Sequence, residues 1–397
     1  MAFQSVQSYL VEAHRLLSIC NGKELATYLQ CTDKHALNSR LALAEPETVV
    51  GSVFEAPWDE IFSAHLRCLW AIASNNFEEA CACQLVLVKA LTKVFSEVKE
   101  ENWMLPVVIV VAVDLRRFAY ALDISNKRKD ESNSTYGSHL ERIAQAIMKL
   151  FQICAADSRT AIEDSKKRGM MGLANQLFKI YFQINKLNLC KPIIRAIENM
   201  NMDAYFSLAQ RITFNYYVGR KAMFDGDFKM ANTCLTFAFE RCLASHHTNK
   251  RLILIYLIPV RMLLGIFPRN SLLQKYKLQE LEGIANAART GNVQKLGEEL
   301  QRYEGFFISC GIYLILEKLK MLTYRNLFKK VAGLLKTHLQ PIPAFTDILK
   351  VMGVEDIDTD ETECILANLI YEGKIKGYLA HQQQKLVVSK VQAFPPL

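Results

Sequence analysis

The sequence predicts a mostly α-helical protein, in which degenerate tetratricopeptide-like helical repeats form a solenoid that is capped at its C-terminal end by a winged helix. Three observations predict this fold. Apolar residues recur at helical spacing from the start of the chain to about residue 337, and the turns between the helices resemble one another. Strand-like alternation is nearly absent until Lys374, where an apolar helix leads into a hairpin. Helix followed by hairpin is the order in which a winged helix ends.

The composition is that of an ordinary soluble protein, with 397 residues that are 51% hydrophobic and 22% charged. The beginning of the chain, MAFQSVQSYLVEAHRLL, does not read as a signal peptide. The longest apolar runs, 104–113 and 252–260, are about half the roughly 20 residues of a membrane span, so we expect two buried helices. Eleven cysteines without a CxxC pair indicate reduced thiols and a nuclear or cytoplasmic protein.

The repeats are recognised by their turns. Residues 75–80 (NNFEEA), 226–231 (GDFKMA) and 291–296 (GNVQKL) each place Gly or Asn where one helix ends, Asp or Asn where the next begins, and an apolar residue directly after it. Gly and Asn tolerate the left-handed conformation that ends a helix, and Asp or Asn caps the following one. We expect N-terminal repeats over 1–206 and further repeats over 207–320. The polar stretch 125–138 is predicted to be a loop, and 127–129 (KRK) is a weak nuclear-targeting candidate or an ordinary solvated segment.

The winged helix is predicted over 321–391, followed by a tail over 392–397. A helix over 324–335 has an apolar side, and the two prolines of PIPAFT (341–346) exclude a helical start there. A short helix then ends at Gly353, and a third helix with an acidic beginning precedes the hairpin KIKGYLA and KLVVSK. The side chains expected on the core side of the first helix are Leu327, Phe328, Val331, Leu334 and Leu335.

Four segments carry a resemblance to a known family: 175–197 (NQLFKIYFQINKLNLCKPIIRAI), 216–231 (YYVGRKAMFDGDFKMA), 376–390 (KGYLAHQQQKLVVSK) and 394–397 (FPPL). Together they resemble PCI-domain proteins, and among these the PCI subunit of the nuclear transcription-and-export (TREX-two) complex. A related branch beside the signalosome shares much of the pattern.

The resemblance implies a non-catalytic scaffold in the nucleus, including the nuclear pore, that supports messenger-RNA export. It implies a partner scaffold protein of the Sac/GANP type and a small, acidic, mostly disordered subunit that is shared with the proteasome lid. It also implies a composite surface that binds RNA or DNA with little sequence preference.

Enzyme motifs are not found in the sequence. It has no Walker loop, no GxSxG and no HExxH, and Gly22-Lys23-Glu24 lacks the rest of a phosphate loop. The adjacent His246 and His247 would point about 100° apart on a helix, which favours a solvated helix end over a metal site. We therefore predict no catalytic residue, no metal and no cofactor. Four cysteines are expected to be core thiols, namely Cys81, Cys83, Cys234 and Cys242.

A basic excess in the middle and late part of the chain, within a net charge of +8, could attract nucleic acid or an acidic protein, or could be a solvated surface without a partner. Arg325, Lys329 and Lys336 share one helix face, and Lys330 flanks it. Lys374, Lys376, Lys385 and Lys390 lie on or beside the hairpin. The alternative is that these lysines serve solubility and protect a strand edge.

The third helix argues against base reading in a DNA groove, since its segment carries Asp356, Asp358, Asp360, Glu361, Glu363 and Glu372. We expect the hairpin instead to dock a partner PCI module at the exposed edge of its second strand, through Leu386 and Val388. The acidic subunit is expected near 166–168 (KKR) and along Lys179, Lys186, Lys191 and Arg195. A PCI subunit of a signalosome- or proteasome-lid-like assembly without nucleic-acid binding stays open as the second interpretation.

Overall fold

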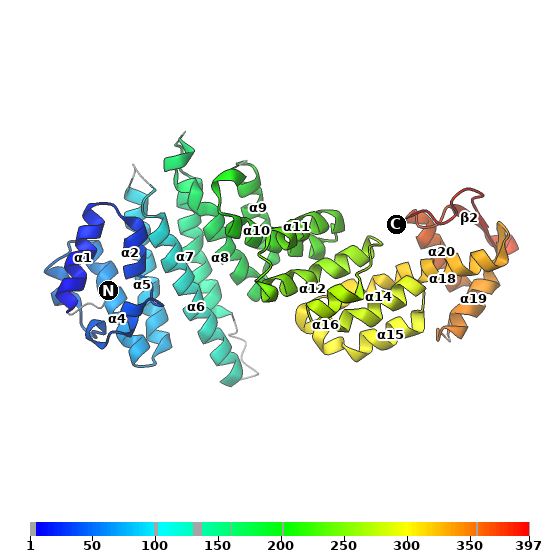
Figure 1. The fold of residues 1–397 in the computed structure, drawn as a ribbon, viewed down its shortest axis with the longest axis horizontal. Helices are drawn as coiled ribbons and strands as arrows, with labels where there is room; N and C mark the ends of the chain where they lie inside the picture. Colours follow the sequence, from blue (N-terminus) through cyan, green and yellow to red (C-terminus); the bar gives the residue numbers. More distant parts are fainter. Residues whose placement is uncertain are drawn as a thin grey trace. The chain divides into compact units, whose positions relative to one another are not determined.

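A computed structural model describes residues 5–98, 102–129, 137–159, 161–200, 202–354 and 356–396. The chain is mostly helical and forms helical repeats with a C-terminal winged helix, which confirms the predicted fold class (Figure 1). It divides into an N-terminal unit, Met1–Tyr217, and a C-terminal unit, Val218–Leu397. Among the described residues, no helix has both the length and the apolar character needed to cross a membrane.

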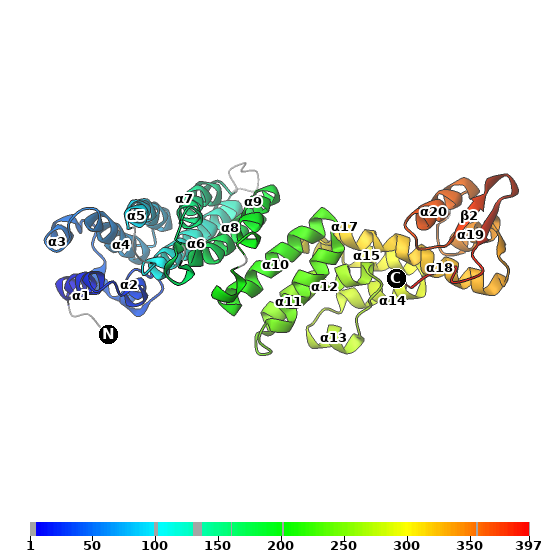
Figure 2. The same ribbon diagram turned by 90° about the horizontal axis from the view of Figure 1, so that it is seen from above.

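The N-terminal unit is a succession of helices in which each one packs against the next. Helix α4 packs on α5, α5 on α6, α6 on α7 and α7 on α8, while α5 also touches α7 and α6 touches α8 (Figures 1 and 2). This neighbour-on-neighbour packing is that of helical repeats. The helices are α1 (Val6–Ser18), α2 (Gly22–Tyr28), α3 (Glu47–Gly51), α4 (Trp58–Ala73), α5 (Phe77–Glu97), α6 (Leu105–Lys129), α7 (Ser138–Ala155), α8 (Met170–Gln183), α9 (Cys190–Glu198) and α10 (Leu208–Asp225), which crosses into the C-terminal unit.

The repeat turns have the predicted chemistry. Asn76, Asp227 and Asn292 cap α5, α11 and α15, each accepting a hydrogen bond from the backbone N–H three residues on, at 2.9–3.1 Å. The residue before each cap has positive φ. At Gly291, where φ is +74°, an added Cβ would lie 2.5 Å from the backbone nitrogen of Leu327, so only glycine fits this turn.

The C-terminal unit continues the helical pairs and ends in the winged helix. Helix α11 packs on α12, and α14 packs on both α15 and α18. The helices are α11 (Phe228–Arg241), α12 (His247–Leu263), α13 (Asn270–Lys275), α14 (Glu280–Thr290), α15 (Val293–Arg302), α16 (Glu304–Cys310), α17 (Tyr313–Glu317) and α18 (Leu319–Leu335).

The winged helix follows α18 and consists of β1 (Leu339–Pro341), α19 (Ile342–Val351), α20 (Thr359–Tyr371), β2 (Gly377–Ala380) and β3 (Lys385–Val388). Its strands form an antiparallel sheet in the order β1-β3-β2. Phe328, Phe345, Leu366 and Leu386 are fully buried in its core, which joins α18, both short helices and the sheet.

Two of the local expectations at this end of the chain are wrong. Helix α19 starts at Ile342 despite the prolines, because Pro343 lies in the first turn. Backbone N–H groups there have no intrahelical acceptor, so a proline loses no hydrogen bond. Leu334 is 82% exposed rather than buried, whereas Leu327 and Phe328 are buried as predicted.

The predicted loop over 125–138 is also wrong in part. Helix α6 continues to Lys129, so 125–129 are helical, and the rest of that segment up to residue 136 lies outside the described residues. The side chains of the nuclear-targeting candidate at 127–129 lie outside them as well.

Val331 and Leu335, also predicted on the core side, are half-buried. The predictions for the long apolar runs and for the four core cysteines agree with the structure. The two long apolar runs lie in α6 and α12, and most of their side chains are buried. Cys81, Cys83, Cys234 and Cys242 are buried in the core, as predicted. Burial is the main cause that raises the pKa of both Cys81 and Cys83 to about 11, which makes them unreactive near neutral pH.

Candidate nucleic-acid and partner interface

The sheet register collects basic residues at one end of the winged helix. The N–H of Val388 donates to the carbonyl of His338 at 3.0 Å, and the N–H of Ser389 donates to the carbonyl of Lys376 at 2.8 Å. The start of β1, the end of β3 and the start of β2 therefore meet. Three exposed lysines flank this meeting point, and we call them the basic end: Lys336, Lys376 and Lys390.

The outer face of the same sheet carries an apolar row. Tyr378 pairs with Val387, and Val387 pairs with Leu339, so these side chains follow one another across the three strands. Tyr378 is 64% exposed and Leu339 is 51% exposed. We call Tyr378, Val387 and Leu339 the outer row. Exposed apolar side chains at adjacent positions offer a surface for a partner protein.

The partner residues predicted on the hairpin are wrong. Leu386 and Val388 alternate with the outer row and point into the core, where both are buried. Strand β3 is also the central strand, since it pairs with β1 as well as β2, so it has no free edge. The outer strands of the sheet are β1 and β2, and the outer row is the face on which a partner would find apolar groups.

Arg325, predicted to bind phosphate, has a structural role instead. It is 5% exposed, and its guanidinium donates to the side-chain oxygen of Asn326 at 2.9 Å and to the carbonyl of Pro395. The guanidinium also lies 5.9 Å from the ring of Phe394. Burial lowers the pKa of Arg325. The tail is thus fastened onto α18, and the predicted basic helix face is covered at this position.

The other predicted lysines do not all join the basic end. Lys329 and Lys330 are exposed on α18, between one and two turns before Lys336. The Lys374 amine is paired with Glu372 at 2.6 Å. Lys385 lies at the opposite end of β3, half-buried and paired in register with Ala380 and Pro341.

The acidic segment before and within α20 has a structural explanation. Asp358 and Glu361 form a capping box, in which the N–H of Glu361 donates to Asp358 at 2.7 Å. Glu363 makes a 2.6 Å hydrogen bond with the Nδ1 of His381 in the wing turn, and this contact raises the pKa of His381. The start of α20 and the wing turn therefore form an acidic end, opposite in sheet register to the basic end.

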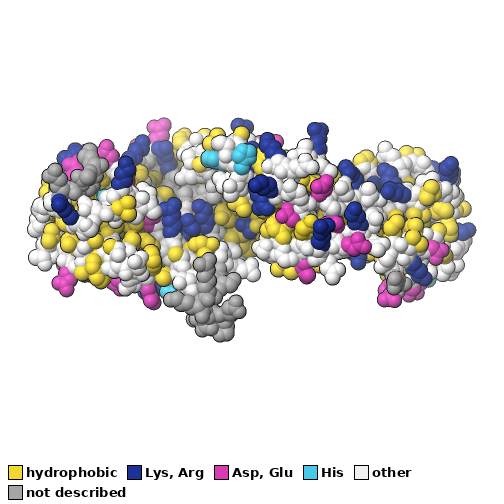
Figure 3. All heavy atoms as spheres, turned by 60° about the horizontal axis from the view of Figure 1, so that its bottom comes forward, with side chains coloured by type: hydrophobic (Ala, Val, Ile, Leu, Met, Phe, Trp, Pro, Cys, Tyr) yellow, Lys and Arg dark blue, Asp and Glu magenta, His cyan; other side chains and the backbone are white. Residues whose placement is uncertain are grey.

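The cations predicted for an acidic partner in the N-terminal unit are divided between two sites. Lys179 on α8 lies near Arg116 and Arg117 of α6, and its pKa is lowered, first by burial and then by these two arginines. The Lys186 amine is paired with Glu141 at 2.5 Å, at a separate place. Figure 3 shows a contiguous group of Lys and Arg side chains on one face of this unit.

The remaining predicted partner cations differ in exposure. Lys191 and Arg195 are exposed on α9. Lys166 is buried, and its amine donates to the carbonyls of Phe95 and Val98. Arg116 and Arg117 were missed because they follow the long apolar run on a different helix, and only the packing of α6 on α8 brings them to Lys179.

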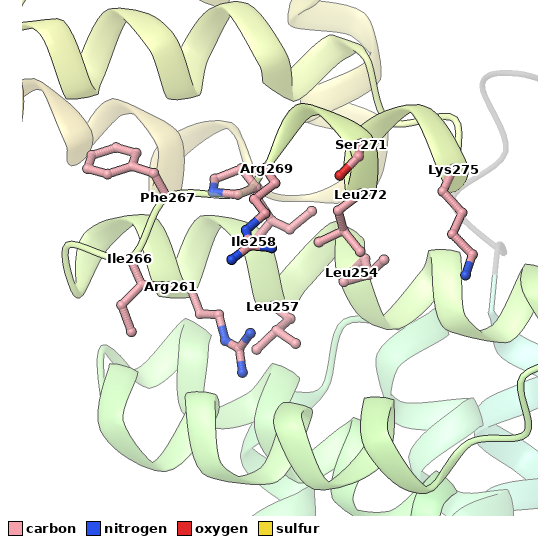
Figure 4. A pocket seen from close by; sticks show the side chains of 11 residues that line it. Leu254, Leu257, Ile258, Arg261, Ile266, Phe267, Arg269, Ser271, Leu272 and Lys275 are labelled. Carbon is pink, nitrogen blue, oxygen red and sulfur yellow. The ribbon is translucent and has the colours of Figure 1, made fainter.

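A groove of about 440 Å³ in the C-terminal unit lies between α12 and the segment that forms α13 (Figure 4). Leu254, Leu257 and Leu272 line it, and Arg261 on its wall is tied to Asn232 of α11 at 3.2 Å. Among the described residues, its lining has no carboxylate, histidine or cysteine. Elsewhere in the described ranges, no three His, Cys, Asp or Glu side chains converge as a metal site.

Comparison with known proteins decides the family. The PCI domain family matches residues 300–390, which contain α18 and the whole winged helix. PCI domain-containing protein 2 of Danio rerio is 50% identical over 397 residues, covering 100% of this chain and 99% of that protein. The chain belongs to the PCI domain-containing protein 2 family. The Drosophila melanogaster homolog in this family is 46% identical over 395 residues, with 99% of both chains covered. A more distant relative, "Protein CSN12 homolog" of Mycosarcoma maydis, is 29% identical over 386 residues, with 86% and 85% covered.

Proposed function

We propose that this PCI-domain protein is a non-catalytic scaffold subunit of a nuclear messenger-RNA export complex, located in the nucleus and at nuclear pores. In this proposal it contributes a sequence-independent RNA or DNA contact through the basic end. The supporting observation is the sheet register, which brings Lys336, Lys376 and Lys390 together while the capped carboxylates of α20 lie at the other end. Lysines act on phosphates as point charges and carry no base information.

The proposal gives each partner a separate place on the chain. A scaffold protein of the Sac/GANP type docks on the outer row, where Tyr378 and Leu339 are exposed. A small acidic, disordered subunit lies along Lys179, Arg116 and Arg117, whose mutual repulsion it relieves. This assignment rests on charge complementarity and on the coupling of these three cations.

The second candidate function is a PCI subunit of a signalosome- or proteasome-lid-like assembly without nucleic-acid binding. The outer row favours it, because an exposed apolar face suits a protein partner whether or not RNA is present.

The test is the salt dependence of RNA binding, measured by fluorescence anisotropy with labelled single-stranded RNA, for the full chain alone and with its co-purified scaffold partner. We expect the Lys336→Glu, Lys376→Glu, Lys390→Glu triple variant to lower the slope of log affinity against log salt by about 2, since each single-strand phosphate contact contributes roughly 0.7.

The matched control changes three exposed lysines elsewhere to glutamate, namely Lys34, Lys191 and Lys229. It has the same net charge as the triple variant. If both variants weaken RNA binding equally, the effect comes from overall charge, which would contradict the assignment of the basic end. If RNA is retained neither by the chain alone nor with its partner, the second candidate function is favoured.

A further inference from the structure

A basic groove, of about 440 Å³, lies in the N-terminal unit between α5 and α7. These two helices pack directly on each other. Helical spacing explains the lining, since four residues recur along one face of each helix. The lining is Leu85, Lys89, Thr92 and Lys93 from α5, with Arg142, Gln145, Ala146 and Lys149 from α7.

The groove concentrates positive charge without compensation. Its four cations, Lys89, Lys93, Arg142 and Lys149, are all exposed, and the lining residues that the structure describes include no carboxylate. In the part of the chain that the structure describes, none of the four makes an ion pair. Lys89 and Lys93 are like charges at i,i+4 of one helix and repel each other, so an anion in the groove would reduce that repulsion.

Two nearby carboxylates are engaged elsewhere. Glu141, adjacent to Arg142, is paired with Lys186 at 2.5 Å. Asp123 is buried and accepts hydrogen bonds from the first backbone N–H groups of α7, including that of Leu140 at 3.0 Å. Glu97 follows Lys93 by one turn but is not part of the lining. None of these three carboxylates lines the groove, so its four cations face the opening without a carboxylate among the described lining residues.

The size and chemistry of the groove define the class of that ligand. The helical rise places Arg142 and Lys149 about 10 Å apart along α7, and Lys89 and Lys93 about 6 Å apart along α5. A volume of about 440 Å³ is in the range of small-molecule sites. No aromatic side chain lines it to stack a base, and its apolar members, Leu85 and Ala146, are buried. The groove would therefore attract a ligand mainly through its positive charge.

We propose that the α5–α7 groove binds a small molecule carrying several phosphate groups, of the inositol polyphosphate class. Two cations on each wall match a compact ligand with phosphates on more than one side. Thr92 and Gln145 add hydroxyl and amide groups that can bond phosphate oxygens. This site uses none of the residues assigned to RNA, so it stands independently of the function proposed above.

Isothermal titration calorimetry of the full chain with inositol hexakisphosphate tests the proposal. We expect one site per chain, with affinity at least about tenfold lower in the Lys89→Glu, Arg142→Glu variant because two phosphate contacts become repulsive. The control is Lys191→Glu, Arg195→Glu, which reverses two exposed cations on α9 of the same unit and should leave the affinity within about twofold. A Lys89→Gln, Arg142→Gln variant shows the loss without charge reversal if the first variant folds poorly by circular dichroism.

Three results would overturn the proposal. In the first, the wild-type chain binds no inositol hexakisphosphate. In the second, the two charge-reversal variants lose affinity equally, which would show that binding depends on net charge alone. In the third, the groove variant weakens the binding of a single-stranded oligonucleotide but not that of inositol hexakisphosphate, which would make the groove a nucleic-acid contact instead.

Discussion

Replacing Arg325 by alanine tests whether this buried cation holds the tail rather than a phosphate. The substitution removes hydrogen bonds from a charged donor to Asn326 and to the carbonyl of Pro395, and a contact with Phe394. Hydrogen bonds to charged groups contribute about 1.5–3 kcal/mol each. The Nε of Arg325 is buried and has no hydrogen-bond partner among the described residues, which reduces the net gain, so we expect a loss of about 2–3 kcal/mol.

Hydrogen exchange followed by mass spectrometry measures this loss locally. A cost of about 2 kcal/mol raises the exchange of protected amides in the tail and in α18 roughly 30-fold where that opening governs exchange. Lys329→Ala, an exposed position one turn later on α18, should leave exchange unchanged. If Arg325→Ala leaves exchange unaltered yet weakens RNA binding as much as Lys376→Glu does, Arg325 is a phosphate ligand and the reasoning is wrong.

Two further predictions concern stability. Gly291→Ala should cost about 2–4 kcal/mol in urea denaturation, because it combines left-handed strain with a 2.5 Å approach to Leu327, whereas Gly333→Ala within α18 meets no neighbour and should be neutral or stabilising. The buried His65 and His35 rings, with Nε2 atoms 3.3 Å apart, have lowered pKa values, that of His65 falling to about 3. The unfolded chain therefore binds more protons below pH 6.5, and the N-terminal unit should lose about 2 kcal/mol on acidification to pH 5. The measurement is the melting temperature as a function of pH. His65→Leu should make the melting temperature depend less on pH, and an equally steep dependence in that variant would contradict the role given to His65.

The parts of the fold that could be predicted are those set by local chemistry. The caps at Asn76, Asp227 and Asn292 follow from side-chain oxygens that satisfy the free N–H groups at the beginning of a helix. The apolar runs in α6 and α12 were assigned to buried helices because their length is too short for a membrane. Such features require only the neighbouring residues, so the sequence contains all that is needed to find them.

The errors arose where distant segments decide the outcome. Arg325 has the periodicity of an exposed helix face, and only the return of the tail, 70 residues later, buries it. Strand β1 is three residues long and has no detectable alternation, so its pairing with β3 could not be expected from its sequence. That pairing makes β3 central. Leu386 therefore belongs to the core. The alternating pattern of KLVVSK is compatible with this but does not show which of its two faces is buried.

The division of charge in the winged helix limits how this protein can hold nucleic acid. In the proposed function, the three lysines of the basic end would neutralise about three phosphates, and the resulting salt slope of about 2 would be far below that of proteins that bind nucleic acid tightly on their own. The helix that would enter a DNA groove begins with carboxylates that are occupied in capping it and in holding His381. Sequence reading through that helix is therefore unfavourable, and tight binding requires further cations. A partner docked on the outer row, close to Lys376, would be well placed to supply these cations. RNA affinity should therefore rise on assembly while sequence preference stays low.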